Sequence, residues 1–376
     1  MLVVTRWLQT PPSESLRAFA LAVTALEQLG QEPERQIVAF RGYATLTLLV
    51  KQRPFTSQEL GTIRRFAAER SFDLVYAPDL HADEVNRYNI LTEPVYTDLF
   101  NAYLDADDRA AWLATYVFDV TPPVDDGPFF SHFFKWSQAR QVLAEFGKSS
   151  QPFGGAGYFV LVALLGLATG ASALLIVLPV LALRRRAGYV AHLPRTLGYF
   201  ALLGLGYLFV EIPLIQHFIL FLGHPAYAMT AVLFALLLFS GVGSALSHGL
   251  SLRLALTLLV VLVVGYALGL PLLFAATLRL PWAGRAAVAV AAVAPAGFLM
   301  GIPFPQGLHC LEMQDASHVP WAWGVNGAMS VVASVLAALL ALSFGFRVVF
   351  LCGALCYAGA WITAPQKGGV VPGRSI

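Results

Sequence analysis

Seven stretches of about 20 predominantly apolar residues follow one another in the second half of the chain, and they constrain its fold more than any other feature. They cover residues 157–183, 197–222, 226–248, 252–274, 284–308, 321–343 and 345–363. In lipid, only helices and closed barrels satisfy all of their backbone hydrogen-bonding groups. The sequence therefore predicts a mainly α fold, a polytopic membrane helix bundle of about seven spans at residues 157–363, with a tail at 364–376.

The distribution of charge divides the chain in two. Residues 1–150 carry 14 Lys+Arg and 19 Asp+Glu, a net charge of −5, whereas residues 151–376 carry 10 Lys+Arg and 3 Asp+Glu, a net charge of +7. Only 12% of the whole chain is charged, against about 25% in soluble domains. We therefore expect a soluble first part and a second part whose partner is the lipid bilayer. The acidic soluble part argues against nucleic-acid binding.

The first 118 residues have the alternating strand and helix signals of an α/β domain. The predicted elements are a buried strand at Leu2–Thr5, a helix at 14–30 with Ser13 as its N-cap, a hairpin of strands at 36–40 and 45–50, a helix from Thr56 to Arg70 that opens with a capping box at Thr56 and Glu59, and a short extended piece at 72–76. This order resembles the closing third of a methyltransferase-type Rossmann sheet, which ends in an antiparallel hairpin.

A cofactor site is missing from this predicted domain. Rossmann-type folds bind their cofactor at a Gly-rich turn after the first strand, and residues 1–150 contain no Gly-rich strand–turn–helix. We therefore expect an incomplete α/β Rossmann-like domain at 1–118, with no cofactor-binding residues and an unpaired sheet edge at Leu2–Thr5.

From residue 79 to the first span, the sequence is polar and then aromatic. A run of carboxylates, which is more typical of a solvated face than of a cation site, comprises Asp79, Asp83, Glu84, Asp105, Asp107 and Asp108. Residues 119–156 read as a juxtamembrane linker, because Phe129, Phe130, Phe134 and Trp136 are residues that favour the bilayer interface. This linker is expected to include a short amphipathic helix ending at Phe146. The three cysteines, Cys310, Cys352 and Cys356, have no metal-ligand spacing and are expected to be free thiols.

Polar residues inside the spans are the candidate functional residues. Glu211 is the only acidic residue between Glu145 and Glu312, and on a helix it shares a face with Gly204, Tyr207 and Leu208. An ionisable group at membrane depth costs about 2.5–3.5 kcal/mol, so it needs a partner or a purpose. Glu211 therefore fixes bundle packing, couples protons or cations, or contacts substrate. The remaining intramembrane polar candidates are Gln216, His217, His224, Gln306 and Asn326.

Prolines and glycines predict interruptions in two spans. The second span has Pro213, and the fifth has Pro295, Gly301, Pro303 and Pro305. Proline removes a backbone donor, and carbonyls freed at membrane depth must bind protein or cavity water. Other small residues, including Gly204, Gly241–Ser244 and Ser330, read as helix-packing faces, and Trp321 and Trp323 read as interface anchors.

Three segments carry a resemblance to a known family. The run Phe209–Pro225, the turn at Gly301–Pro305 and the segment Trp321–Gly327 resemble a bacterial family of spermidine-synthase-like or methyltransferase-like integral-membrane proteins. The segment Asp125–Phe130 is similar to that family's Asp-Asp-Arg-Pro-Phe turn, although Gly127 stands where Arg is usual. The resemblance implies the end of a Rossmann-like domain followed by the final membrane bundle.

Three functions remain open at this point. The resemblance implies a spermidine-synthase-like protein of the bacterial inner membrane, with its soluble part in the cytoplasm. Such a chain lacks autonomous catalysis. It would bind S-adenosylmethionine or its decarboxylated form only if an upstream half completes the domain. The second is a transporter or permease-like bundle that uses Glu211 and interrupted helices. The third is a membrane scaffold for a Rossmann-like partner. No catalytic residue is identified, so enzyme activity stays open.

Overall fold

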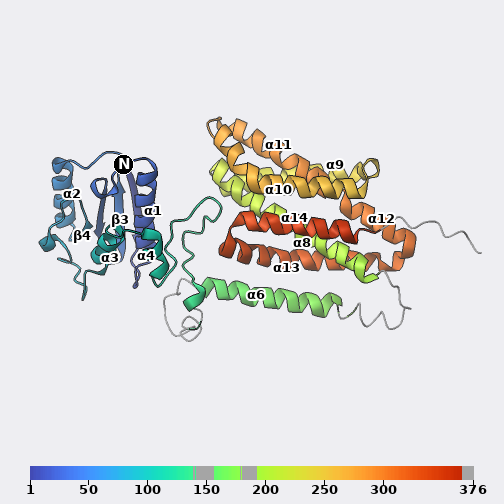
Figure 1. Ribbon diagram of the computed structural model, residues 1–376, viewed down its shortest axis with the longest axis horizontal. Coiled ribbons are helices and arrows are strands. Elements are labelled where there is room, and N and C mark those ends of the chain that lie inside the picture. Colours follow the sequence, from blue (N-terminus) through green and yellow to red (C-terminus); the bar gives the residue numbers. More distant parts are fainter. Residues whose placement is uncertain (139, 141–155, 178, 180–192, 366–376) are drawn as a thin grey trace, which may run out of the picture. The chain divides into compact units, whose positions relative to one another are not determined.

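The chain forms two units (Figure 1). The computed structural model describes residues 1–138, 140, 156–177, 179 and 193–365. Residues 1–124 and 128–157 make up the first, called here the α/β unit, and residues 125–127 and 158–376 make up the second, the helical unit. The predicted helix ending at Phe146, the end of the first predicted span and the tail from residue 366 lie outside the described residues.

Four antiparallel strands form the sheet of the α/β unit. They are β1 (Leu2–Trp7), β2 (Ile37–Arg41), β3 (Thr45–Val50) and β4 (Asp73–Tyr76), in the order β1-β3-β2-β4. The predicted hairpin is confirmed as β2 and β3, with Ile37 opposite Val50. Because side chains alternate along a strand, each strand supplies both faces of the sheet.

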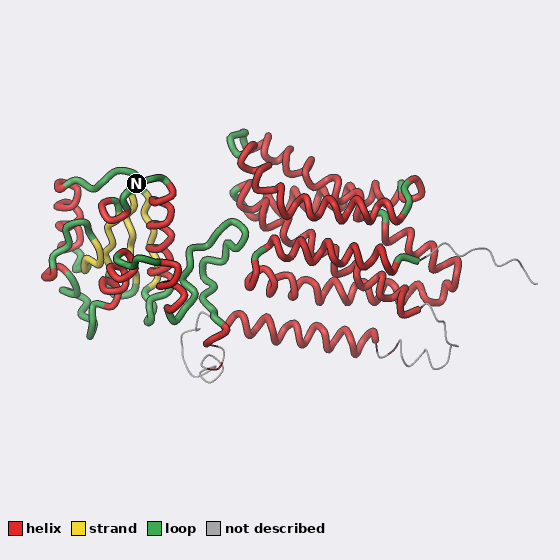
Figure 2. Tube along the Cα trace, in the orientation of Figure 1, coloured by secondary structure: helices red, strands yellow, loops and turns green. Residues whose placement is uncertain are grey.

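Helices cover both faces of this sheet (Figure 2). They are α1 (Glu14–Gln28), α2 (Ser57–Glu69), α3 (Val95–Leu104) and α4 (Arg109–Thr115), with short 3₁₀ turns at Pro33–Arg35, Ala82–Glu84 and Trp136–Gln138. Ile37 and Ala39 face a core that includes Phe19 of α1 and Phe100 of α3, whose stacked rings have centroids 3.9 Å apart. Val38 and Phe40 face the opposite core, beneath α2. β2 is therefore buried along its whole length.

Of the two predicted helix starts, the structure confirms the capping box of α2 but not a side-chain cap at the start of α1. The capping box is confirmed, because the Thr56 hydroxyl accepts from the Glu59 N–H at 3.3 Å and Glu59 accepts from the Thr56 N–H at 2.9 Å. Ser13 holds the N-cap position of α1, but its hydroxyl donates to the Gln9 side chain and does not cap the helix.

Two expectations about burial were wrong. β1 is an edge strand whose Leu2 and Val3 are 60% and 53% exposed, because it pairs only with β3. The exposed edge expected at Leu2–Thr5 is therefore present, but the strand is not buried. The segment after residue 118 is also more than a linker, because Val120 and Phe133 pack into the core of the α/β unit and Arg6 stacks on Phe130. Phe130 and Phe133 are therefore packed within their own unit, whereas Trp136 is 65% exposed.

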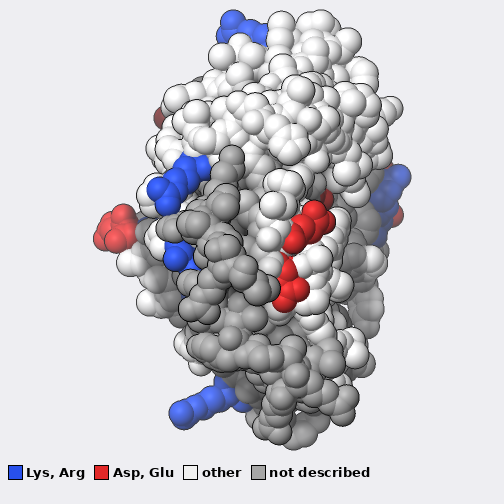
Figure 3. Space-filling view, turned by 90° about the vertical axis from the view of Figure 1, so that its right-hand side faces the viewer, with Lys and Arg blue, Asp and Glu red and all other residues white. Residues whose placement is uncertain are grey.

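The helical unit contains the long apolar helices. Their bounds are α6 (Ala156–Ser172), followed by a π-helical turn (Ala173–Val177), α8 (Leu193–Leu222), α9 (Pro225–Ala245), α10 (Leu252–Thr277), α11 (Trp282–Met300), α12 (Pro303–Asp315), α13 (Val319–Phe344) and α14 (Phe346–Thr363), with 3₁₀ turns at Ser247–Gly249 and Ala316–His318. Among the described residues, six helical segments are long and apolar enough to cross a membrane, and one of them, Trp282–Phe344, joins α11, α12 and α13. These apolar helices are compatible with lipid contact. On the face seen along the helices in Figure 3, few charged side chains lie among the described residues.

α8 is the central helix of this unit. It packs against α9, α13 and α14, while α11 packs along α9 and α10 along α14. Its 30 residues give a length of about 45 Å, and its buried side chains include Phe200, Val210 and Phe218. The three cysteines are free, as expected.

The helix interruptions are fewer than predicted. α8 continues through Pro213 and α11 continues through Pro295, so neither proline breaks its helix. A single proline removes one hydrogen bond, which neighbouring helices and local adjustment can compensate. The chain does leave the helix at Gly301 and Ile302, because Pro303 and Pro305 remove two donors in succession and Pro303 begins α12 instead.

The acidic turn at Asp125–Gly127 belongs to the helical unit and caps one of its helices. The Asp126 carbonyl accepts from the Phe346 N–H, and its carboxylate accepts from the Arg347 N–H, both at 2.8 Å. Gly345, with φ of +85°, allows the tight turn into α14 at this point. The turn that carried part of the family resemblance thus supplies acceptors to the first two N–H groups of α14, whose N-cap residue is Gly345.

Candidate functional site

Glycines bring two sets of helices into close contact. On α9, Gly243 lies against the backbone of Phe298 in α11, and the backbone of Ser240 lies against Gly301. On α8, Gly204 lies against the backbone of Asn326 in α13, and Gly206 lies against the Tyr357 ring in α14. A side chain at any of these positions would hold the helices further apart. The bundle is thus built from α9 with α11, and from α8 with α13 and α14.

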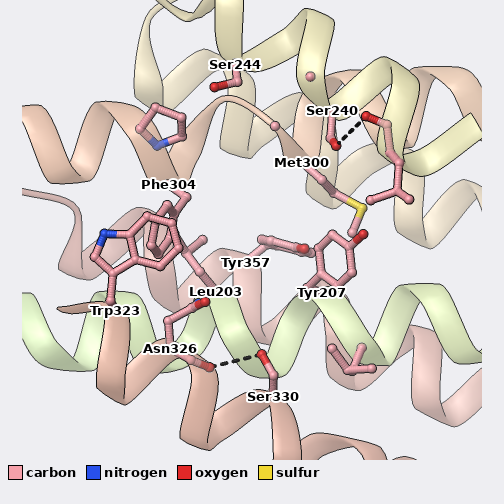
Figure 4. A pocket seen from close by; sticks show the side chains of 15 residues that line it. Leu203, Tyr207, Ser240, Ser244, Met300, Phe304, Trp323, Asn326, Ser330 and Tyr357 are labelled. Carbon is pink, nitrogen blue, oxygen red and sulfur yellow. Dashed lines mark hydrogen bonds between the residues drawn. The ribbon is translucent and has the colours of Figure 1, made fainter. Parts of the chain in front are cut away.

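A cavity of about 520 Å³ lies between these two sets (Figure 4). Its lining comes from α8, α9, α13, α14 and the α11–α12 junction, and comprises Leu203, Tyr207, Leu208, Leu237, Ser240, Gly241, Ser244, Met300, Gly301, Phe304, Pro305, Trp323, Asn326, Ser330 and Tyr357. α9 contributes mostly small side chains to this wall, which leave the space unfilled. Leu237 and Trp323 are 67% and 59% exposed, so the cavity reaches the surface of the unit.

Hydrogen bonds to backbone carbonyls fix the floor of the cavity. The Asn326 amide donates to the Phe200 carbonyl at 3.0 Å, and the Ser330 hydroxyl donates to the carbonyls of Asn326 at 3.0 Å and Gly204 at 3.3 Å. Asn326 therefore bridges α13 to α8, and it also lines the cavity. A polar group buried in an apolar bundle requires such a partner.

The interrupted helix lies at the opposite wall. The Tyr199 hydroxyl donates to the Pro303 carbonyl at 2.7 Å, which anchors the first turn of α12. The Gly301 carbonyl lacks the usual helical donor four residues on, because residue 305 is proline. Gly301 itself is one of the lining residues, so the break in the helix lies at this wall.

Aromatic rings complete the lining. Trp323 packs edge-on against Phe304, with ring centroids 4.6 Å apart. Tyr207 and Tyr357 lie side by side near Met300 in Figure 4. None of the lining residues is Lys, Arg or His. Among the described lining residues, the cavity therefore has aromatic rings and hydroxyl groups and no cationic side chain.

Glu211 lies one helical turn beyond this lining. Its half-buried carboxyl interacts with the Tyr207 hydroxyl and, at longer range, with Tyr357. Tyr207 and Leu208, predicted to share the helix face of Glu211, both line the cavity. The carboxyl group is thus connected to the cavity through a lining residue.

The other predicted polar residues do not line the cavity. His217 is buried, with its ring stacked 5.8 Å from Phe350, and Gln216 beside it is half-buried. His224 is the N-cap of α9, where its Nδ1 accepts from the Ala226 N–H at 3.2 Å. The Gln306 amide donates to the carbonyls of Leu250, at 2.7 Å, and Ser247. His217, His224 and Gln306 therefore have structural roles in the bundle.

Several cavity residues had been assigned other roles from the sequence. Ser330 and Gly241–Ser244 were interpreted as packing faces and Trp323 as an interface anchor, while Tyr357 carried no signal. Small residues mark both close packing and unfilled space, so the sequence alone does not distinguish the two.

Within the described residues, no group of three or more His, Cys, Asp and Glu side chains is placed to hold a metal ion.

Comparisons with other proteins assign no family. No protein-family model, no curated protein and no solved structure matches the chain. The cavity is therefore the feature from which a function is inferred.

Proposed function

We propose that the helical unit is a membrane-embedded binding domain that takes up a small molecule in the cavity between α8, α9, α12 and α13, as a permease-like protein does. The cavity itself carries this proposal. Its volume of about 520 Å³ is within the range of ligand pockets, and its lining combines apolar walls with a few fixed polar groups. An interrupted helix at the cavity wall, here at Gly301 and Ile302, is a feature of transporter binding sites.

A cysteine-accessibility experiment tests whether the cavity admits water and small solutes. In a background with Cys310→Ser, Cys352→Ala and Cys356→Ala, Ser330→Cys places a thiol in the cavity. Ser334→Cys is the matched control, since it lies one turn further along α13 and is exposed on the outside of the bundle. Thiols react with N-ethylmaleimide as thiolates, which form where water is present.

We expect Ser330→Cys to react about tenfold faster than Ser334→Cys in protein reconstituted in lipid nanodiscs. Equal slow rates at both positions would mean a dry, closed bundle and would refute the proposal. Gel filtration of both variants checks that the bundle remains intact.

A second candidate function concerns the α/β unit. We propose that it is the end of a Rossmann-like domain in a spermidine-synthase-like membrane protein, and that a partner segment supplies the opening strands. The order β1-β3-β2, with β3 antiparallel to both neighbours, supports this, because it matches a sheet that closes with an antiparallel hairpin. An apolar groove of about 830 Å³ beside β1, lined by Val4, Leu21 and Leu26 among others, gives the added strand a place to pack.

Co-expression with the polypeptide encoded immediately upstream tests this second function. Val3→Lys puts a charge on the exposed edge strand, and Tyr43→Lys is the control, because Tyr43 is 92% exposed in the hairpin turn. We expect Val3→Lys alone to abolish co-purification, and only the complex to bind S-adenosylmethionine. Binding of S-adenosylmethionine by the chain alone would overturn this second function, because it requires a partner segment to complete the domain.

A further inference from the structure

The charge of Glu211 has no compensating cation in the described part of the helical unit. Arg195, Arg253, Arg285 and Arg347 contact backbone carbonyls or an aromatic ring elsewhere in the unit. Among the described residues, no ion pair includes Glu211. A carboxyl group at membrane depth costs about 2.5–3.5 kcal/mol, and the described residues give Glu211 the Tyr207 hydroxyl as a neighbour but no cationic partner.

Aromatic rings lie at both ends of the cavity. Tyr207 and Tyr357 lie near Met300, Trp323 and Phe304 lie at the other end (Figure 4), and a cation within about 6 Å of the face of such a ring is attracted by its quadrupole. Hydroxyl groups of Tyr207, Ser240 and Ser330 also belong to lining residues. An anionic ligand would find no Lys, Arg or His among the lining residues.

We infer that the cavity binds an organic cation, a small molecule with a quaternary or protonated amine, and that Glu211 supplies the neutralising charge. This inference rests on the proposed function and specifies its ligand class. The ammonium group lies among the aromatic rings near Tyr207, while its apolar part lies against Leu203, Leu237 and Met300. Since Leu237 is exposed about 18 Å along α9 from Pro225, the cavity opens beside the middle of a span, where an amphiphilic cation enters from the lipid.

Protection of the cavity thiol measures this preference. The Ser330→Cys protein is labelled with N-ethylmaleimide in the presence of increasing benzyltrimethylammonium. Neopentylbenzene, which has carbon in place of the charged nitrogen, and benzenesulfonate, which is an anion, serve as comparison ligands. We expect the apparent Kd of the ammonium compound to be at least about tenfold lower than that of either comparison ligand.

Variants at position 211 test the role of the carboxylate. Glu211→Gln removes the charge at constant shape, and we expect it to raise the apparent Kd for the ammonium compound about tenfold. Glu211→Asp retains the charge and should restore the Kd to within about threefold. Glu312→Gln, at an exposed carboxylate on α12, is the matched control and should change nothing.

The outcomes separate the two proposals. If neopentylbenzene protects as well as the ammonium compound, or if Glu211→Gln binds the ammonium compound normally, the cation inference is wrong and the binding site stands. If Ser330→Cys is not labelled at all, the proposed binding function fails first. If Glu211→Gln does not yield an intact bundle, the comparison of the three ligands in the Ser330→Cys protein alone decides the ligand class.

Discussion

The α/β unit and the helical unit satisfy their polar groups in different ways. In the α/β unit, charged side chains meet one another: Asp73 and Arg41 are 3.4 Å apart and both buried, and Arg64 contacts Asp79 and Glu84. In the helical unit, neutral side chains donate to backbone carbonyls of neighbouring helices, as Asn326 does to Phe200, Tyr199 to Pro303 and Gln306 to Leu250.

This difference reflects the two solvents. An ion pair next to water can be partly hydrated, whereas a bundle in lipid gains from close backbone packing and from hydrogen bonds that need no charge. Glu211 departs from this pattern, because it places a carboxyl group within α8, one helical turn beyond the cavity lining. The comparison therefore predicts that the α/β unit depends on charge and the helical unit on small residues.

The largest expected effect comes from Asp73. Its carboxylate accepts from the N–H groups of Arg87 and Tyr88 at 2.6 Å and of Asn89 at 2.8 Å, and it pairs with Arg41. Asp73→Asn turns an acceptor into a donor and leaves Arg41 buried without its ion pair, so we expect the α/β unit to lose about 3–5 kcal/mol.

Hydrogen exchange of β2 and β4 in the full chain, in increasing urea, measures the loss in this unit alone. Asp107→Asn is the control, because Asp107 is exposed. Similar exchange in the two variants would show that the buried ion pair does not stabilise the unit.

Acid should destabilise the α/β unit and spare the helical unit. Burial alone would raise the pKa of Asp73, but hydrogen bonds from Tyr88 and Asn89 and the charge of Arg41 outweigh it and leave the pKa lowered. Hydrogen bonds from Arg64 likewise lower the pKa of Asp79. A lowered pKa means that the unfolded state binds more protons, so this stabilisation is complete above the unfolded pKa of about 3.9 and is lost as the pH falls through the folded value.

We therefore expect the exchange protection of β2 and β4 to fall steeply below about pH 4, while the protection of α8 and α13 changes little. The two units are read in the same sample, so each serves as the reference for the other. Equal loss of protection in the two units would contradict the prediction that the α/β unit depends on charge and the helical unit on close packing.

Signals from neighbouring residues predicted most of the elements. The features that were not predicted depend on contacts between residues distant in sequence. The capping box at Thr56 and Glu59 and the hairpin need only neighbouring residues, and the structure confirms both. The exposure of β1 depends on which strand lies beside it, which its own residues do not encode. A proline predicts a helix break, but whether the break occurs depends on its surroundings. Pro213 and Pro295 lie within helices, whereas Pro303 begins one.

The cavity was the least predictable feature. It joins Leu203 of α8 to Tyr357 of α14 across more than 150 positions, and it exists because α9 presents serines and glycine to it. The sequence identified Asn326 and the helix face of Glu211. It did not identify Ser240 or Tyr357, because their position depends on how the glycine-mediated helix pairs dock.

The smallest expected effect tests these glycines. A Cβ at Gly243 would overlap the Phe298 carbonyl, so Gly243→Ala must separate α9 from α11. We expect a loss of about 1–3 kcal/mol from the helical unit, the range typical of overpacking. Gly241→Ala, two residues away on the same helix, is the matched control, because a Cβ there meets nothing within 4 Å. Thermal unfolding in detergent, followed by exchange in α9 and α11, should show a lower midpoint for Gly243→Ala alone. Equal midpoints for the two variants would mean that close backbone contact does not hold these helices together, and that the bundle, like the α/β unit, depends on its polar groups.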